Sequence, residues 1–457
     1  MDQSSLFKPR QLATVPSNET QNTAKATELT KNEFYCVSVL PARPSVLKEP
    51  FDSLNGYADH LSNYALVVGE KTLNVWRYTS TDPVPLLIQF PVLNVLPLAI
   101  LTAPTLADDP GILIIDSASG HMKFYESVQH APALGLITNR LLEAQVSLAT
   151  GEYITLAENV EPAGVAIATS KGRCALISLR DYSNKPSLKV VDLPFSRNRG
   201  LLNFSLFGST GTSRDEIVSI KTVETANELQ LIAVVDASGN FNLITLQQST
   251  ESVYVVKSES FWQLLLQQIR QNLEGFASLD LRIVDLWPMK AATSALIYLA
   301  LVSVGSKELA LVTLRVEKSG VLAYGTHKLH QVNPERLLVT KPKLYLPAPH
   351  KTAFVVLGSQ IVLTDVDISY IETQNTNVYY TPRWEDTIRL KSNINVVGSG
   401  YEDQSNTTNP SVILISTDLG ILRVERFAST PNQPTKSLTK LPEVIVKSHI
   451  EQAIYFS

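Results

Sequence analysis

Seven times along this chain of 457 residues, a run of apolar residues stops at a short polar turn and then resumes. The runs are rich in β-branched and aromatic residues, whereas the turns are rich in Gly, Asp and Ser. The turns lie at residues 69–71, 116–120, 169–173, 236–239, 305–308, 358–360 and 416–420. Because turn residues that accept left-handed backbone angles separate two β-prone runs in each case, we predict seven β-hairpins.

The spacing of these hairpins predicts the architecture. They recur at intervals of roughly 50 to 70 residues, about the length of one four-stranded propeller blade with insertions. The strand pattern begins near Phe34 and continues to about Val446. We therefore predict an all-β fold, a seven-bladed β-propeller over residues 33–445 with one inserted helix and long loops.

The two ends of the chain depart from the strand pattern. Residues 1–32 are rich in Ser, Thr, Asn and Gln and carry few large apolar residues, so we predict a disordered N-terminal lead. A Pro- and Thr-rich segment, 428–442, follows the last hairpin, and residues 446–457 have apolar positions that could begin a helix. We predict that a C-terminal helical region starts there.

One segment between the hairpins has helical periodicity. Its apolar residues fall on one stripe of a helix: Trp262, Leu265, Leu266, Ile269, Leu273 and Phe276. Ser258 or Ser260 is the expected N-cap, and Gly275 is expected to mark the exit. We interpret the segment as a surface helix packed on the blades in preference to a partner-binding helix.

Composition narrows the class of protein. The formal net charge of -4 argues against a nucleic-acid-binding domain, which would present a strongly basic face. Cys36 and Cys174 each lie beside an apolar run, so we expect buried free thiols and an intracellular, reducing compartment. The polar N-terminus does not resemble a signal peptide, and no apolar run approaches the roughly 18 to 20 residues of a membrane span.

The sequence holds no phosphate-binding loop, zinc-protease motif, Cys-x-x-Cys pair or hydrolase nucleophile elbow. His327 and His330 are close in sequence, but we expect them to point to opposite faces. Glu385 and Asp386 are adjacent, and we interpret them as part of a solvated surface. Asp116 and Asp236 indicate turn chemistry. We therefore predict no catalytic residues, no bound metal and no cofactor.

The segment 193–214 has an unusual composition for a loop between two blades. Large apolar residues gather in it, its other residues are mostly Ser, Thr, Asn and Gly, and arginines flank it. This composition is typical of a helix that inserts into loosely packed lipid headgroups, whereas a strand or a packed loop of the propeller is the alternative. The candidate membrane-binding residues are Arg197, Arg199, Leu201, Leu202, Phe204, Leu206, Phe207 and Arg214.

Three regions carry a resemblance to a known family. They are the first hairpin with its terminal Trp76, the helical segment that leads into residues 279–286, and the C-terminal region of residues 384–390, 396–400, 413–416 and 420–424. In this order they resemble the N-terminal propeller of the one-thirty-three family of Y-complex nucleoporins, in its fungal version. The resemblance covers about residues 34–456.

The resemblance implies a seven-bladed propeller followed by a helical stack that joins other Y-complex nucleoporins. It implies a non-enzymatic scaffold at the nuclear pore complex that supports mRNA export and protein transport, with a membrane-sensing loop at residues 197–213 that contacts curved nuclear envelope. No direct nucleic-acid binding is expected. The alternatives are an inner-ring nucleoporin propeller and an interaction propeller of a vesicle-coat type of assembly.

Overall fold

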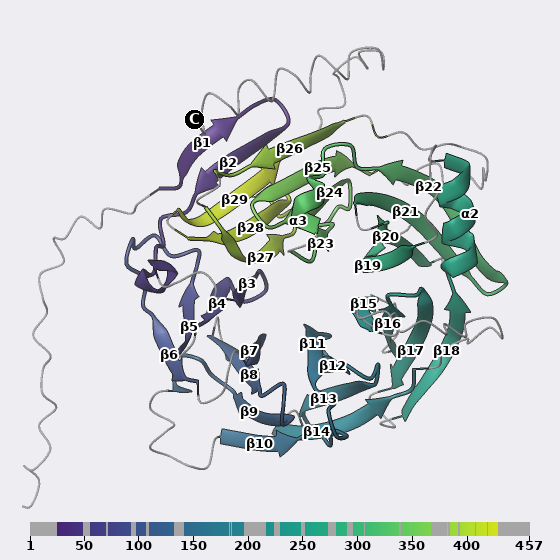
Figure 1. Ribbon diagram of the computed structural model, residues 1–457. Helices are drawn as coiled ribbons and strands as arrows, with labels where there is room; N and C mark the ends of the chain where they lie inside the picture. Colours follow the sequence, from purple (N-terminus) through teal and green to yellow (C-terminus); the bar gives the residue numbers. More distant parts are fainter. Residues whose placement is uncertain are drawn as a thin grey trace, which may run out of the picture.

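The computed structural model describes residues 25–427, apart from 49–54, 70–71, 93–96, 107–108, 132–140, 182, 184, 196–215, 224–228, 248–251, 273–279, 290–295, 306, 338–339, 367–381, 383, 392–393, 407 and 418. Within these residues the regular secondary structure is almost entirely antiparallel β-sheet, arranged as a closed ring around a central axis (Figure 1). The elements follow one another around the ring in chain order (Figure 1).

Five sheets of four strands make up most of the ring. In each sheet, neighbours in sequence are neighbours in space, as the short connections of a meander require. The first of these sheets holds β7 (Leu98–Leu106), β8 (Asp109–Ile115), β9 (His121–Tyr125) and β10 (Leu141–Gln145), and the second holds β11 (Ile154–Asn159), β12 (Val165–Thr169), β13 (Cys174–Arg180) and β14 (Pro186–Leu193). The third holds β15 (Ile217–Val223), β16 (Leu229–Asp236), β17 (Asn240–Gln247) and β18 (Ser252–Ser260), and the fourth holds β19 (Leu281–Met289), β20 (Leu296–Val304), β21 (Glu308–Glu317) and β22 (Gly320–Lys328). The fifth holds β23 (Lys343–Tyr345), β24 (Thr352–Leu357), β25 (Gln360–Asp365) and β26 (Glu385–Arg389).

The remaining strands form one sheet of nine, which divides at its single parallel pair, β27 with β3. On one side lie β3 (Asn55–Asp59), β4 (Tyr64–Val68), β5 (Thr72–Arg77) and β6 (Ile88–Pro91). On the other side lie β27 (Val396–Glu402), β28 (Ser411–Ser416), β29 (Gly420–Arg426), β2 (Tyr35–Val39) and β1 (Thr27–Lys31). The described strands therefore form seven blades, in agreement with the predicted seven-bladed propeller.

The seven predicted hairpins are the two middle strands of each blade, such as β4 with β5 and β28 with β29. A middle strand is covered on both faces by the neighbouring blades, so it reads as a continuous apolar run. Every residue of β12 and of β24 is buried, for example. The expected turn roles of Asp116 and Asp236 are confirmed, because their carboxylates accept backbone N–H groups of Ala118 and Ser238, each at 3.0 Å.

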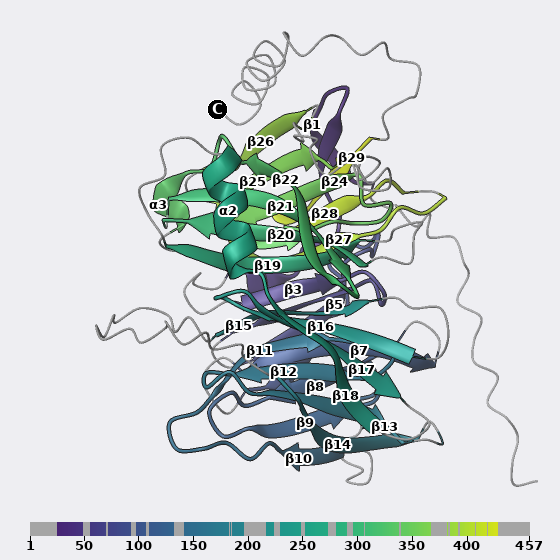
Figure 2. The same ribbon diagram turned by 90° about the vertical axis from the view of Figure 1, so that its right-hand side faces the viewer.

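The predicted surface helix is α2 (Trp262–Asn272), which packs against β22 at the rim of the fifth blade (Figure 2). Its Leu265 and Ile269 side chains are buried, as the apolar stripe predicted. The predicted N-cap was wrong, because Ser258 and Ser260 belong to β18 and pair with β17. The first turn instead begins at Phe261, whose carbonyl accepts the N–H of Leu265 at 2.8 Å. Leu273, Gly275 and Phe276 lie outside the described residues.

Two shorter helical elements, η1 (Ser45–Lys48) and α3 (Pro334–Leu337), lie in connections between strands. None of the described helices is long and apolar enough to cross a membrane. Cys36 and Cys174 are buried free thiols, as predicted.

The expected extent of the disordered lead was wrong at its end, because β1 lies within residues 1–32. This strand pairs with β2, and the turn between them is fixed by Asn32, whose side chain accepts the N–H groups of Phe34 and Tyr35 at 2.8 Å. In turn, β2 pairs with β29, so an N-terminal strand completes the seventh blade. Residues 1–24 of the predicted lead and the predicted helical region at 446–457 lie outside the described residues.

Candidate functional site

The connection between the fifth and sixth blades is held by polar side chains of the sixth blade. It runs from the end of β22 to α3, over residues 329–333. Glu385 at the start of β26 accepts the N–H of His330 at 2.9 Å, and Gln360 of β25 accepts the N–H of Asn333 at 3.1 Å. The amide group of Gln360 also donates to the carbonyl of Gln331. Residues far apart in sequence therefore determine the path of this connection.

His327 and His330 meet at Glu385, so the prediction that they point to opposite faces was wrong. His327 Nε2 lies 2.6 Å from Glu385 Oε2, and His330 Nδ1 lies 3.4 Å from the same oxygen. The reason is that β22 ends at Lys328, and the N–H of Leu329 then bonds to the carbonyl of Leu309 at 2.9 Å. The strand alternation stops before His330, whose ring turns back towards Glu385.

The predicted solvated position of Glu385 and Asp386 was also wrong. Their exposed fractions are 3% and 1%. The connection covers the carboxylate of Glu385, whereas that of Asp386 accepts the N–H of Thr387 at 2.7 Å. Sequence alone shows a charged pair in a polar stretch and does not show which distant segment covers it.

Two imidazoles and a carboxylate are ligand types that zinc uses, and the ligand atoms of His327, His330 and Glu385 all lie within 4.8 Å of one another. Two ligand atoms of one tetrahedral zinc would lie roughly 3.4 Å apart, given metal–ligand distances of about 2.1 Å. The 2.6 Å between His327 and Glu385 is the distance of a charge-assisted hydrogen bond. The geometry therefore favours a hydrogen-bonded cluster that joins two blades.

The cluster changes the acidity of its members. Burial acts to raise the pKa of Glu385, but hydrogen bonds from His327 and His330 outweigh it and lower this pKa to about 2. The hydrogen bond to Glu385 raises the pKa of His330 above its usual value, against the opposite effect of burial. The ionised carboxylate and a protonated His330 are thus both favoured in the folded chain.

We expect the contribution of Glu385 to stability to disappear in acid. Because its folded pKa of about 2 lies below the ordinary 4.5, the ionised form stabilises the fold above pH 4.5, and this contribution falls as the pH drops towards 2. Urea unfolding of the wild type and of E385Q should therefore give midpoints that differ near pH 6 and converge near pH 2.5. A difference that stays constant over this range would contradict the assignment.

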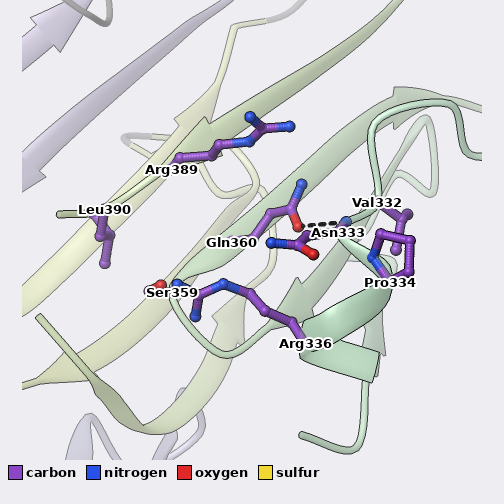
Figure 3. A pocket seen from close by; sticks show the side chains of 8 residues that line it. All are labelled: Val332, Asn333, Pro334, Arg336, Ser359, Gln360, Arg389 and Leu390. Atoms are coloured by element: carbon purple, nitrogen blue, oxygen red, sulfur yellow. Dashed lines mark hydrogen bonds between the residues drawn. The ribbon is translucent and has the colours of Figure 1, made fainter. Parts of the chain in front are cut away.

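A pocket of about 390 Å³ opens beside this connection (Figure 3). The side chains of Arg336, from α3, and of Arg389, from the end of β26, lie on different sides of it, with Gln360 and Asn333 between them (Figure 3). Its lining residues are Val332, Asn333, Pro334, Arg336, Ser359, Gln360, Arg389 and Leu390. No sequence motif identified this pocket, because it combines residues of α3, β25 and β26 with residues of the loops beside them.

The inner strands of the blades surround the central axis (Figure 1), and several titratable groups lie on them. Lys221 Nζ is 3.4 Å from Glu158 Oε2, and Asp285 accepts the hydroxyl of Ser219 at 2.8 Å and the N–H of Leu344 at 3.1 Å. Each of these charges has a structural partner. Lys221, Glu158 and Asp285 therefore hold the inner strands together. They do not form a catalytic pair in which one carboxyl group acts as an acid and another as a base.

The candidate membrane-binding residues, from Arg197 to Arg214, lie outside the described residues. The segment that contains them joins β14 of the third blade to β15 of the fourth. Membrane binding by this segment therefore remains a prediction from its composition and from the family resemblance.

A family model described as the Nup133 N-terminal-like domain matches residues 30–423. Nucleoporin NUP133 of Saccharomyces cerevisiae is 24% identical over 471 residues, which cover 94% of this chain and 38% of that protein. NUP133 of Chaetomium thermophilum is 26% identical over 494 residues, which cover 94% of this chain and 36% of that protein. The chain thus spans little more than a third of the length of these relatives.

The crystal structure of the Vanderwaltozyma polyspora Nup133 β-propeller domain matches the fold with a TM-score of 0.71. The match covers 88% of this chain and 100% of that chain at 23% sequence identity. This likeness supports the assignment of the fold as a β-propeller.

Proposed function

Because the chain belongs to the Nup133 N-terminal-like family of nucleoporin domains, we propose that it is a non-enzymatic scaffold module of the nuclear pore complex. The observation that carries this proposal is the family match, which extends over residues 30–423 and so includes all seven blades except parts of the first and last strands. A closed ring of antiparallel blades is a rigid platform that suits binding and positioning.

The finer parts of the proposal follow the family resemblance. We place the chain in the Y-complex coat at the nuclear envelope, where it supports mRNA export and protein transport. Its contacts with other Y-complex nucleoporins are proposed to run mainly through helical sequence beyond this propeller. The relatives are much longer than this chain, so there is room for such a region in the relatives.

A domain exchange tests the scaffold role. This chain would replace the matching propeller of the Saccharomyces cerevisiae protein, with the rest of that protein left intact. We expect the fusion to accumulate at the nuclear rim and to restore distributed pores and mRNA export more fully than the same protein without any propeller. A fusion that behaves no better than the propeller-less control would refute the proposed role.

We further propose that residues 197–213 anchor the propeller to curved membrane. Five large apolar side chains lie within seven residues, from Leu201 to Phe207. Full burial of such a side chain is worth about 1.5 to 3 kcal/mol, shallow insertion recovers part of it, and ordering the segment costs roughly 1 kcal/mol or more per residue. The net affinity should therefore be weak and should depend on packing defects and on anionic lipids that attract the flanking arginines.

Replacing Leu202 and Phe207 by Asp is expected to abolish flotation of the domain with small, highly curved liposomes. Thermal stability should change little, since the proposal places these side chains outside the propeller core. A matched control replaces Tyr254 and Val256, which are about half exposed on β18, by Asp, so it adds the same two negative charges at another place. An equal loss of flotation in the Tyr254 and Val256 control would contradict the membrane proposal. A large loss of stability in the Leu202 and Phe207 variant would contradict it as well.

A further inference from the structure

The two arginines of the pocket in Figure 3 have no acidic partner in the part of the chain that the structure describes. Arg389 donates a long hydrogen bond of 3.4 Å to the carbonyl of Gln331, and Arg336 forms no ion pair with a described carboxylate. Six other described arginines do form such pairs: Arg173, Arg180, Arg282, Arg315, Arg423 and Arg426. The pocket therefore carries two positive charges that no described carboxylate neutralises.

The hydrogen-bonding groups that remain available in the pocket are mainly donors. Asn333 Oδ1 already accepts the N–H of Glu335 at 3.0 Å, which fixes the orientation of the amide and leaves its Nδ2 group as a donor. The oxygen and the nitrogen of the Gln360 amide group both form hydrogen bonds already, so this side chain lines the pocket in a fixed position. Two guanidinium groups and one amide N–H₂ group thus line a space whose described walls carry no carboxylate.

This set of donors fits an anion. A guanidinium group has five N–H donors in a fork that matches the oxygens of a carboxylate or phosphate. The connection that carries Asn333 is held to β25 and β26 by Gln360 and Glu385. Asn333 is therefore positioned before any ligand arrives, which lowers the entropic cost of binding at this donor.

The size and walls of the pocket favour a peptide over a free ion. Its volume of about 390 Å³ exceeds what one carboxylate or phosphate group fills, and Val332, Pro334 and Leu390 add apolar surface beside the charged groups. We propose that this pocket binds an acidic peptide segment of a partner protein, with a carboxylate or phosphorylated side chain held by Arg336 and Arg389. The site is independent of the scaffold role proposed above, which would stand if this pocket failed its test.

Fluorescence anisotropy with labelled peptides tests the proposal on the intact chain. The probes are an Ala/Leu peptide with four glutamates, the same peptide with one phosphoserine in their place, a neutral peptide of equal length, and inorganic phosphate as competitor. We expect the wild type to bind an acidic peptide, and R336Q/R389Q to lose at least tenfold in affinity, because hydrogen bonds to charged groups are the strong ones. Inorganic phosphate should compete only at concentrations far above those of the peptide.

The matched control is R77Q/R270Q, which removes two exposed positive charges from β5 and α2. It should retain the wild-type affinity, and the thermal midpoints of both double variants should stay close to that of the wild type. The proposal is overturned if no acidic peptide binds, or if R336Q/R389Q binds as the wild type does. It is also overturned if the control loses as much affinity, or if inorganic phosphate binds as tightly as the peptides.

Discussion

Replacing Glu385 by alanine is expected to lower the free energy of unfolding by about 3 kcal/mol, because it leaves buried hydrogen-bonding groups without their acceptor, at roughly 1 to 3 kcal/mol each. His327 is buried, and its ring would lose the oxygen that lies 2.6 Å from Nε2. The N–H of His330 would lose its acceptor as well. For a propeller of about 400 residues, this change corresponds to a fall of roughly 4 °C in the melting temperature.

Differential scanning fluorimetry and urea unfolding at neutral pH measure this effect. The matched control is E143A, which removes a half-exposed carboxylate on β10 that lies 3.3 Å from Lys123 Nζ. Exposed pairs of this kind contribute about 0.5 kcal/mol, so the control should change little. If E385A were as stable as E143A, the buried cluster would not be what joins the fifth and sixth blades.

Gly400→Ala is expected to cost about 3 kcal/mol, since it forces two blades apart. Gly400 lies on β27, where the seventh blade meets β3 of the first in the parallel pair. A Cβ atom at this position would lie 2.0 Å from the carbonyl oxygen of Ala58, and one at Gly398 would lie 2.4 Å from that of Gly56. Both obstacles are backbone atoms, so no side chain can move aside to make room.

The control for this prediction is G151A. Gly151 has a φ of +72°, and no atom lies within 4 Å of the place that an alanine Cβ would take, so its substitution strains the backbone without a clash. That strain costs about 1 kcal/mol. Thermal unfolding should therefore rank G400A well below G151A, and the reverse order would mean that the first and seventh blades can separate at little cost.

The middle strands were predictable from sequence because burial on both faces leaves an unbroken apolar run around a turn. The inner and outer strands carry a weaker signal. β23 has only three residues, and three residues of β14 and three of β18 are exposed to solvent. The start of the fold at β1 was missed because Thr27–Lys31 is a polar strand at the edge of its sheet, paired with β2 alone among the described strands.

The interblade site was not predictable, because its partners are set by the closure of the ring and not by local sequence. Glu385 is 55 residues from His330 and 58 from His327, and each of them looks like an ordinary surface residue when read alone. The same holds for Arg336 and Arg389, which become neighbours of one pocket only when the connection lies across β25 and β26. By contrast, the apolar stripe of α2 and the turn aspartates depend on residues a few positions apart in sequence. The burial of Leu265 and Ile269 and the turn roles of both aspartates confirm these predictions for the residues that the structure describes.

The pairing of β2 with β29 has a consequence for how the protein is made. Val39 pairs with Leu422, so the N-terminal hairpin leaves the ribosome long before its partner strand exists. At a synthesis rate of about 5 to 20 residues per second, the intervening chain takes roughly 20 to 80 s to appear. During that interval the edge of β2 presents unpaired N–H and C=O groups to other nascent chains, the kind of edge that seeds aggregation. Chaperones that shield this edge during translation are therefore expected to raise the yield of folded protein.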